Sequence, residues 1–182
     1  HISEMMNSKG KIISIDKYLT KVDIMKKNFE RLEMKNITVY HEDIQAPKTE
    51  LLRENLLNKV DKVLVDAPCT GLGVISKKPD IKWKREAEDI LKLQTIQLEI
   101  LNNASEYVKD GGTLVYSTCT TEEEENENVI FKFLEEHSEF EIDNASKYVP
   151  KEVVNAKGFV EVFPHLHDID GAFGARLIKR IK

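Results

Sequence analysis

The sequence predicts an α/β domain with a mostly parallel sheet and an antiparallel strand near the carboxyl terminus. Short apolar runs alternate along the chain with segments whose apolar residues recur every three or four positions, which is typical of strands alternating with amphipathic helices. Two of these runs, 60–66 and 113–117, lead into the loops that carry the two cysteines, Cys69 and Cys119. Open α/β sheets place their chemistry at such carboxyl ends of strands. The last apolar run, 175–181, is predicted to be the antiparallel strand.

The first part of the chain is predicted to contain three strands and two helices. Residues 11–16 and 36–41 form short strands, and the third strand covers 60–66. A leucine-rich segment, 49–57, is predicted to be a short helix. Between the first two strands lies a helix with one core-facing stripe, because apolar residues recur there at spacings of four and three. The stripe consists of Tyr18, Val22, Met25, Phe29 and Leu32.

The second part begins with a long helix over 86–108, which Asp110-Gly-Gly112 is predicted to end, since glycines commonly terminate helices. After the strand at 113–117, Thr121 and Glu124 have the spacing of a capping box for a further helix, and the acidic run around them suits the first turn of that helix. Short strands are predicted at 140–142 and 158–163. The sequence contains no internal repeat and no interdomain linker, so we expect one domain, 1–182.

The composition is that of an ordinary globular protein. The chain has 182 residues, of which 41% are hydrophobic and 32% are charged, enough to bury a sizeable core. No apolar run approaches the roughly 20 residues that span a bilayer, and two cysteines do not make a disulfide framework. We therefore expect a cytoplasmic protein with reduced thiols. The net charge of −5 argues against nucleic-acid binding through the overall field.

One basic segment, 77–85, departs from this acidic balance. It places five cations around Trp83, directly after the first cysteine loop. Cations interleaved with an aromatic residue suit a phosphate backbone and a stacked base. The alternative is a solvated loop with its tryptophan tucked into the core. The candidate RNA contacts are Lys77, Lys78, Lys82, Lys84 and Arg85.

Asp16 has the position of an acid that holds a nucleotide ribose. Nucleotide-binding α/β domains place a glycine-rich turn after the first strand and this acid about 20 residues later, at the end of the second strand. Counting back from Asp16 runs off the start of the chain, and no glycine precedes Gly10. We therefore expect the first strand and the glycine-rich loop to be lacking, with the gap between the first and third strands of this chain. The alternative is that Asp16 is a surface acid on an edge strand.

Three motifs together resemble one enzyme family. They are Asp66-Ala-Pro-Cys-Thr-Gly71 with Pro79-Asp-Ile-Lys-Trp83, Ser117-Thr-Cys119 with Glu124-Glu-Asn126, and Asp170-Gly-Ala-Phe173 before Ala175-Arg-Leu177. The chain resembles the S-adenosylmethionine-dependent RNA cytosine-5 methyltransferases, above all the bacterial small-subunit ribosomal RNA methyltransferase B (Sun) branch. The resemblance implies a Rossmann-like methyltransferase sheet and methylation of a cytosine in RNA, with 16S ribosomal RNA as the expected substrate. The family's last motif usually reads Asp-Gly-Phe-Phe, so Ala172 replaces an aromatic residue, a change that we expect repacking to tolerate.

The chemistry explains why such an enzyme needs a reactive cysteine. Carbon 5 of cytosine is a poor nucleophile, and attack of a thiolate on carbon 6 makes it electron-rich enough to accept a methyl group. A carboxyl group at ring nitrogen 3 can share or supply a proton. The target base must leave its stack to reach such a site.

The resemblance also assigns roles to individual residues. It implies that Cys119 attacks, that Cys69 assists release of the product, and that Asp66 faces both the cytosine and the cofactor S-adenosylmethionine. It further implies that Asp16 holds the ribose hydroxyls and that Asp43 faces the adenine. The alternatives are two buried structural cysteines, a strand-end cap at Asp16, and a helix cap or turn residue at Asp43.

A second class of methyltransferase fits these motifs less well. Amino-group methyltransferases carry an Asn/Asp-Pro-Pro-aromatic motif, where this chain has Asp66-Ala-Pro-Cys69. A noncatalytic RNA-binding fragment and a transfer-RNA-directed cytosine-5 methyltransferase stay open. His165 and His167 lie two residues apart with no cysteine pair near them in the sequence, so no zinc site is expected.

Overall fold

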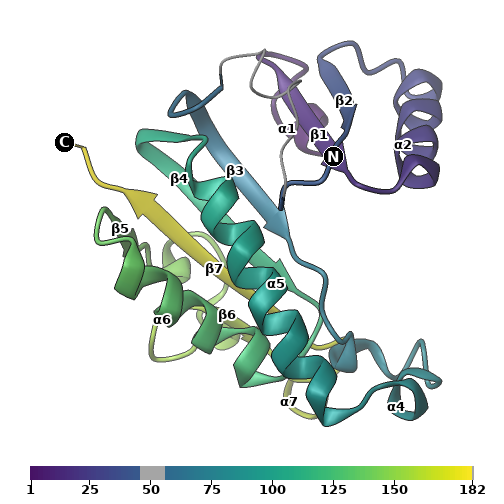
Figure 1. Ribbon diagram of the computed structural model, residues 1–182, viewed down its shortest axis with the longest axis vertical. Coiled ribbons are helices and arrows are strands. Elements are labelled where there is room, and N and C mark those ends of the chain that lie inside the picture. The colour runs from purple at the N-terminus through teal and green to yellow at the C-terminus, as the bar shows by residue number, and fades with distance from the viewer. Residues whose placement is uncertain (46–55, 182) are drawn as a thin grey trace. The chain divides into compact units, whose positions relative to one another are not determined.

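The structure is a computed structural model that describes residues 1–45 and 56–181, shown in Figure 1. The chain divides into two compact units, His1–Leu56 and Leu57–Lys182. The helix predicted for 49–57 lies largely outside the described residues, and Leu56 and Leu57 are not helical. The prediction of a single domain over 1–182 stays a prediction.

The first unit is a two-stranded parallel sheet with one long helix. Its elements are α1 (Ile2–Met5), β1 (Ile12–Asp16), α2 (Leu19–Arg31) and β2 (Ile37–His41). β1 and β2 pair in parallel, and Asp16 lies opposite His41 at the carboxyl end of the pair.

The apolar stripe of α2 is narrower than predicted. Val22 is fully buried and Met25 and Phe29 are half-buried, whereas Tyr18 and Leu32 are exposed. The physical reason is that Tyr18 and Leu32 are the caps of the helix and not part of its regular turns.

The second unit contains a five-stranded sheet in the order β3-β4-β7-β5, with β6 also paired to β7. β3 and β4 are parallel, while β7 runs antiparallel to β4, β5 and β6, so every strand of this sheet except β7 runs the same way. The predicted α/β fold with a mostly parallel sheet and a late antiparallel strand is confirmed. The strands are β3 (Val60–Asp66), β4 (Val108–Thr118), β5 (Phe140–Ile142), β6 (Val160–Val162) and β7 (Ala172–Lys179).

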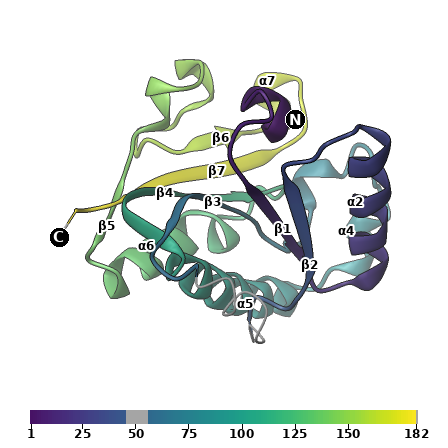
Figure 2. The same ribbon diagram turned by 90° about the horizontal axis from the view of Figure 1, so that it is seen from above.

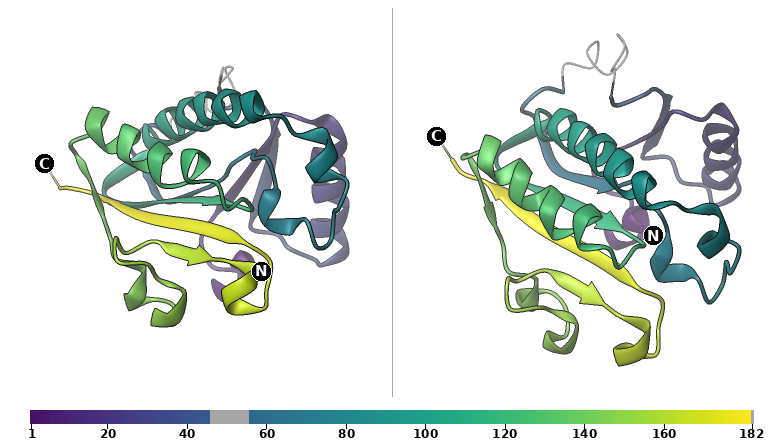
Figure 3. Two further views of the ribbon diagram at one scale, coloured as in Figure 1. Left: turned by 90° about the horizontal axis from the view of Figure 1, so that it is seen from below. Right: turned by 60° about the horizontal axis from the view of Figure 1, so that its bottom comes forward.

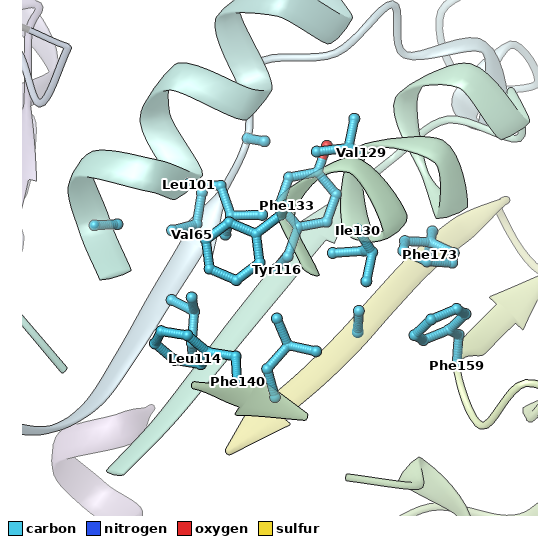
Figure 4. Close-up of a cluster of buried hydrophobic side chains, with 14 of the residues drawn as sticks. Val65, Leu101, Leu114, Tyr116, Val129, Ile130, Phe133, Phe140, Phe159 and Phe173 are labelled. Carbon is cyan, nitrogen blue, oxygen red and sulfur yellow. The ribbon is translucent and has the colours of Figure 1, made fainter. Parts of the chain in front are cut away.

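Two helices, α5 (Ala87–Ser105) and α6 (Glu127–Glu136), cover the same face of this sheet, as Figures 2 and 3 show. The core lies between them and the strands (Figure 4), where Leu101 of α5, Tyr116 of β4 and Phe133 of α6 are fully buried. The short elements of the unit are α4 (Ile81–Lys84), α7 (Pro164–His167) and the 3₁₀ turns Leu72–Val74, Glu123–Glu125, Ala145–Lys147 and Lys151–Val153.

A buried carboxylate ties β7 to the segment after β5. Asp143 accepts hydrogen bonds from Lys147 Nζ (2.6 Å), Arg176 Nε (2.7 Å) and Tyr148 Oη (2.8 Å). Burial alone would raise the pKa of Asp143, but the bonds from Lys147, Arg176 and Tyr148 outweigh burial and lower the pKa to about 2. The carboxylate therefore stays ionised and paired at neutral pH.

The prediction that Asp110-Gly-Gly112 ends the long helix is wrong. α5 ends at Ser105, and β4 begins at Val108 and runs through all three residues. The carbonyl of Tyr107 instead accepts from the amides of Lys59 and Val60, which starts the pairing with β3. The glycines serve an irregularity in that pairing, because Gly111 has a φ of 72° and the register shifts there.

The predicted capping box of Thr121 and Glu124 is also wrong. Residues Glu123–Glu125 form a 3₁₀ turn, and α6 begins only after Asn126. A capping box does occur at the start of α5, between Glu86 and Asp89. None of the helices within residues 1–45 and 56–181 combines the length and the apolar character of a membrane span. The same residues contain no group of three acids, histidines or cysteines placed to hold a metal ion.

Candidate active site

The two cysteine loops meet at one edge of the sheet. β3 and β4 are neighbouring parallel strands, and Asp66 at the end of β3 lies opposite Ser117 in β4. The loops that follow bring Cys69 Sγ to within 3.3 Å of Cys119 Sγ. The carboxyl ends of parallel strands are where such folds place reactive groups. The structure thus brings together two thiols that lie 50 positions apart in the sequence.

The two thiols have different surroundings. Cys69 is partly buried, and its sulfur accepts a hydrogen bond from the backbone amide of Cys119 at 3.4 Å. Burial raises the pKa of the Cys69 thiol to about 12, so this sulfur keeps its proton at neutral pH. Cys119 is exposed, so it is the sulfur that a substrate can reach. A protonated Cys69 can donate its S–H toward Cys119 and stabilise negative charge there.

The buried carboxylate of Glu125 holds the loop of Cys69 in position through hydrogen bonds. The Glu125 side chain has no exposed surface, and it accepts from Thr70 Oγ1 at 2.5 Å and from the Thr70 amide at 2.9 Å. A third bond comes from Gln97 Nε2 of α5 at 2.9 Å, and this amide nitrogen also donates to the carbonyl of Pro68 at 2.8 Å. Buried charges persist when they are hydrogen-bonded in this way.

The same network extends to the loop of Cys119 through Thr120. Because Thr70 donates its hydroxyl proton to Glu125, it must accept from Thr120 Oγ1, which lies 2.9 Å away. Thr120 Oγ1 in turn accepts from the amide of Glu122 at 3.3 Å. Each threonine directly follows one of the two cysteines, so one directed chain of hydrogen bonds holds both thiol-bearing loops.

Two further polar side chains complete the support. Tyr116 Oη donates to the backbone carbonyl of Glu125 at 2.6 Å, and burial raises the pKa of Tyr116, which keeps its proton in place. Asn126 accepts from Thr118 Oγ1 at 2.6 Å and donates to the carbonyl of Thr120 at 3.1 Å. The end of β4 is therefore held by buried hydrogen bonds on both sides of Cys119.

The third motif reaches the same place through two glycines. The Gly73 amide donates to the carbonyl of Cys119 at 3.1 Å, and the Gly171 amide donates to the carbonyl of Gly73 at 2.8 Å. A Cβ atom on Gly73 would lie 2.5 Å from the carbonyl oxygen of Gly171, which no side chain can occupy. Glycine at position 73 therefore lets three motifs, distant in the sequence, pack backbone to backbone.

The predicted acids lie at strand ends, and their roles stay predictions. Asp66 is exposed and accepts from Ser117 Oγ at 3.3 Å. Asp16 lies in the first unit, where one carboxylate oxygen accepts from the Tyr18 amide at 2.8 Å and the other pairs with Lys21 at 3.5 Å. Asp43, also in that unit, accepts from the amide of the residue two positions later at 3.0 Å. Both acids of the first unit thus accept a hydrogen bond from the amide two residues further on, which is the pattern of a local turn.

In the basic segment 77–85, the tryptophan is exposed. Trp83 is 80% exposed, so the alternative of a tryptophan packed into the core is wrong. Lys82 Nζ lies 5.2 Å from the centre of the Trp83 ring. An exposed ring with a cation beside it is suited to stacking against another flat group.

Other cations of the segment are tied to neighbouring parts of the site. Lys77 pairs with Asp170 of the third motif, and Arg85 Nε donates to the carbonyl of Thr70 at 3.1 Å. Lys84 forms an exposed pair with Asp80 at 3.5 Å. The segment is therefore anchored to the cysteine loop and to the third motif, while its role in RNA binding stays a prediction.

Glu125 and its partners Thr70 and Gln97 have no assigned role in the predicted site, although Thr70 and Glu125 lie within the motifs that carry the family resemblance. In the sequence, Glu125 is the last of four consecutive glutamates, 122–125, which looked like an ordinary acidic helix start. Gln97 lies within a long helix and carries no local signal of a functional role. One signal was available, because the same dipeptide, Cys-Thr, occurs at 69–70 and at 119–120.

Comparison with known proteins gives one consistent family. The family model described as 16S rRNA methyltransferase RsmB/F matches residues 1–178. "Probable ribosomal RNA small subunit methyltransferase B" of Bacillus subtilis is 40% identical over 99% of this chain and 40% of its own length. The chain spans about 40% of the length of the curated relatives it matches.

Two solved structures are similar over nearly the whole chain. The crystal structure of PH0851 has a TM-score of 0.89 at 33% identity, covering 98% of this chain and 39% of that protein. The structure of NSun6 from Pyrococcus horikoshii with SFG has a TM-score of 0.84 at 31% identity, covering 100% of this chain and 44% of that one. Because the family model covers almost every residue and confirms the resemblance of the three motifs, this chain belongs to the RsmB/F family of 16S rRNA methyltransferases.

Proposed function

We propose that this chain is the catalytic part of an S-adenosylmethionine-dependent enzyme that methylates carbon 5 of a cytosine in 16S ribosomal RNA. The observation that carries the proposal is the 3.3 Å approach of Cys69 Sγ and Cys119 Sγ at the ends of two parallel strands. Membership of the RsmB/F family supports an RNA substrate, and several relatives are named for the small ribosomal subunit. A transfer-RNA target is the alternative substrate within the same chemistry.

The first step is attack of the Cys119 thiolate on carbon 6 of the cytosine. Cys119 suits this role because it is exposed, whereas Cys69 keeps its proton through its raised pKa. The protonated Cys69 can donate a hydrogen bond to the Cys119 thiolate before attack. Asp66 is the carboxyl group proposed to face ring nitrogen 3 and to share or supply a proton there.

The later steps restore the base and free the enzyme. S-adenosylmethionine supplies the electrophilic methyl group that carbon 5 accepts. A base then removes the proton from carbon 5, the bond between Cys119 and carbon 6 breaks, and the electron pair of that bond returns to sulfur. Cys69, 3.3 Å away, can donate to the departing sulfur, which accounts for its proposed part in product release.

The first unit has carboxylates in positions that suit the cofactor. Asp16 ends β1, Asp43 follows β2 by two residues, and the two strands are parallel neighbours with Asp16 opposite His41. Both acids therefore lie at the same edge of the two-stranded sheet. Carboxylates at such an edge accept hydrogen bonds from ribose hydroxyls, and we assign Asp16 to the ribose and Asp43 to the adenine.

The basic segment is the proposed contact for the RNA backbone. Its five cations surround the exposed Trp83 and follow directly on the loop of Cys69. Cations of this kind supply the salt-dependent part of nucleic-acid affinity. The residues assigned to this role are Lys77, Lys78, Lys82, Lys84 and Arg85.

Covalent trapping tests the proposal in the full-length protein that contains this chain. RNA with 5-fluorocytosine at the target should form a stable adduct, because fluorine blocks the proton loss that release requires. Cys119→Ala should abolish the adduct, whereas Cys69→Ala, the matched control, should still form it and should also accumulate an adduct with natural RNA. An adduct with Cys119→Ala would refute the assigned nucleophile, and RNA binding without any adduct by wild-type protein would favour a noncatalytic role.

A further inference from the structure

A pocket of about 420 Å³ opens beside the cysteine loops. Its lining comes from three places in the second unit: residues within 72–76, which follow the loop of Cys69, then Thr121, which follows the loop of Cys119, and residues 163–165 at the start of α7. The pocket thus adjoins the candidate active site although none of its walls belongs to the basic segment.

The pocket is distinct from the space at the two sulfurs. Neither cysteine lines the pocket. Backbone lies between the pocket and the sulfurs, because the Gly73 amide donates to the carbonyl of Cys119 at 3.1 Å. The sulfur that attacks the target base is therefore not part of this pocket. The base of the nucleotide next to the target in the RNA strand is the kind of ligand that would reach the pocket.

The lining suits a flat, uncharged group with polar edges. The rings of Phe163 and His165 lie with their centres 5.7 Å apart, and Ile75 adds an aliphatic surface. The hydroxyl groups of Ser76 and Thr121 already donate to Asp170 at 2.9 Å and to Glu122 at 3.5 Å, so toward the pocket they can serve as acceptors. A nucleobase has this combination, since its faces stack on aromatic rings and its edges form hydrogen bonds.

The charges near the pocket favour a base and not a phosphate inside it. The described residues that line the pocket include no lysine, arginine or acid, and the neighbouring Lys77 is paired with Asp170. Beyond Ser76 the chain continues into the basic segment, where Lys78, Lys82 and Trp83 are exposed. The phosphates of an RNA strand would find cations there while one of its bases entered the pocket.

We propose that this pocket binds the base of a nucleotide adjacent to the target cytosine in single-stranded RNA, stacked against Phe163. The proposal rests on the proposed function, because it takes RNA as the substrate at Cys119. It gives the site a means of selecting sequence or strand geometry on one side of the target. Phe163 is suited to this because it is only half-buried and its ring lies outside the hydrophobic core of the unit.

The test compares Phe163→Ala with wild type in the full-length enzyme, using steady-state methylation of the 16S ribosomal RNA segment that wild type modifies. We expect KM to rise roughly 5- to 150-fold, the range for losing one base–aromatic stack, with kcat nearly unchanged. The second arm uses the same RNA with an abasic site on the 5′ or the 3′ side of the target. One of these two RNAs should raise KM for wild type by the same factor, and Phe163→Ala should then cause no further loss.

Leu166→Ala is the matched control, because Leu166 lies in α7, three residues after Phe163, and is 66% exposed but does not line the pocket. Phe163→Leu keeps apolar bulk without a flat ring and should reproduce the loss if Phe163→Ala folds poorly. An unchanged KM in both Phe163 variants, or a loss of equal size on intact RNA and on both abasic RNAs, would overturn the proposal. Methylation of intact RNA by wild type separates that outcome from failure of the proposed function, which would show as no methylation at all.

Discussion

Replacing Glu125 tests whether one buried carboxylate holds both cysteine loops in position. Glu125 accepts three hydrogen bonds, two from Thr70 and one from Gln97, and has no exposed surface. In Glu125→Gln the amide has one oxygen and one NH₂ group in place of two acceptor oxygens. If the oxygen faces the Thr70 amide and Gln97, the NH₂ group faces the Thr70 hydroxyl, which must turn round and accept. Thr120 then loses the acceptor for its own hydroxyl proton.

The size of the effect follows from these bonds. Hydrogen bonds to a charged group contribute about 1.5–3 kcal/mol and neutral ones about 0.5–1.5 kcal/mol, and a buried group left unpaired costs about 1–3 kcal/mol. Removing the buried charge offsets part of this loss. We therefore expect Glu125→Gln to lower the free energy of unfolding by roughly 1–3 kcal/mol, and Glu125→Ala, which orphans all three donors, by roughly 4 kcal/mol. Domains of this kind have about 5–15 kcal/mol in total, so both variants should still fold.

In the Glu125 variants, kcat for RNA methylation should fall further than the loss of folded protein alone would cause. A displacement of about 1 Å in a reacting group can cost about 100-fold in rate, and Glu125 positions the loop of Cys69 through Thr70 and, through Thr120, the loop of Cys119. The assays are urea unfolding, kcat for RNA methylation, and the pH dependence of thiol alkylation, which a merely structural role would not change.

Glu123→Gln is the matched control, because Glu123 lies in the same 3₁₀ turn but is exposed. That variant should behave like wild type in all three assays. A Glu125→Ala variant with wild-type stability and kcat would refute the reasoning.

Three further predictions concern single sites. Asp143→Asn should lower the free energy of unfolding by about 2 kcal/mol, because the pKa of Asp143 is about 2 in the folded state against 3.8 in the unfolded state. This stabilisation is fully present above about pH 3.8 and is lost as the pH falls through about 2. Urea unfolding from about pH 2 to about pH 6 should therefore show a weaker loss of stability at acid pH in the variant than in wild type. Gly73→Ala should destabilise the protein and abolish methylation, whereas Gly174→Ala, whose new Cβ would meet its nearest neighbour at 3.5 Å, should do neither. Limited alkylation with iodoacetamide at pH 8 should modify Cys119 before Cys69, because burial raises the pKa of Cys69 to about 12; mass spectrometry showing the reverse order would contradict the assigned roles.

Much of the fold could be predicted from the sequence because its signals are local. The predicted strand 60–66 matches β3 residue for residue; it ends in Asp66, and Cys69 follows in the next loop. The glycines at 111 and 112 were misassigned because the same residues suit a helix end and a strand irregularity, and the choice depends on pairing with β3. The support of the active site was out of reach for a similar reason. Glu125 acquires its importance only when Thr70 and Gln97, from other parts of the chain, fold onto it.

The hydrogen bonds around the cysteines have a geometry with its own consequence. At the start of the 3₁₀ turn, the Glu122 amide donates to Thr120 Oγ1. At the end of the turn, the Glu125 carboxylate accepts from Thr70 Oγ1. Thr120 and Thr70 connect the two, so the path closes into a ring through the turn itself. The ring requires a fixed separation between the Glu122 amide and the Glu125 carboxylate. Inserting or deleting one residue within 122–125 would change that separation and break the ring. The spacing of these glutamates, together with the carboxylate of Glu125, therefore holds the loops in which the two sulfurs meet.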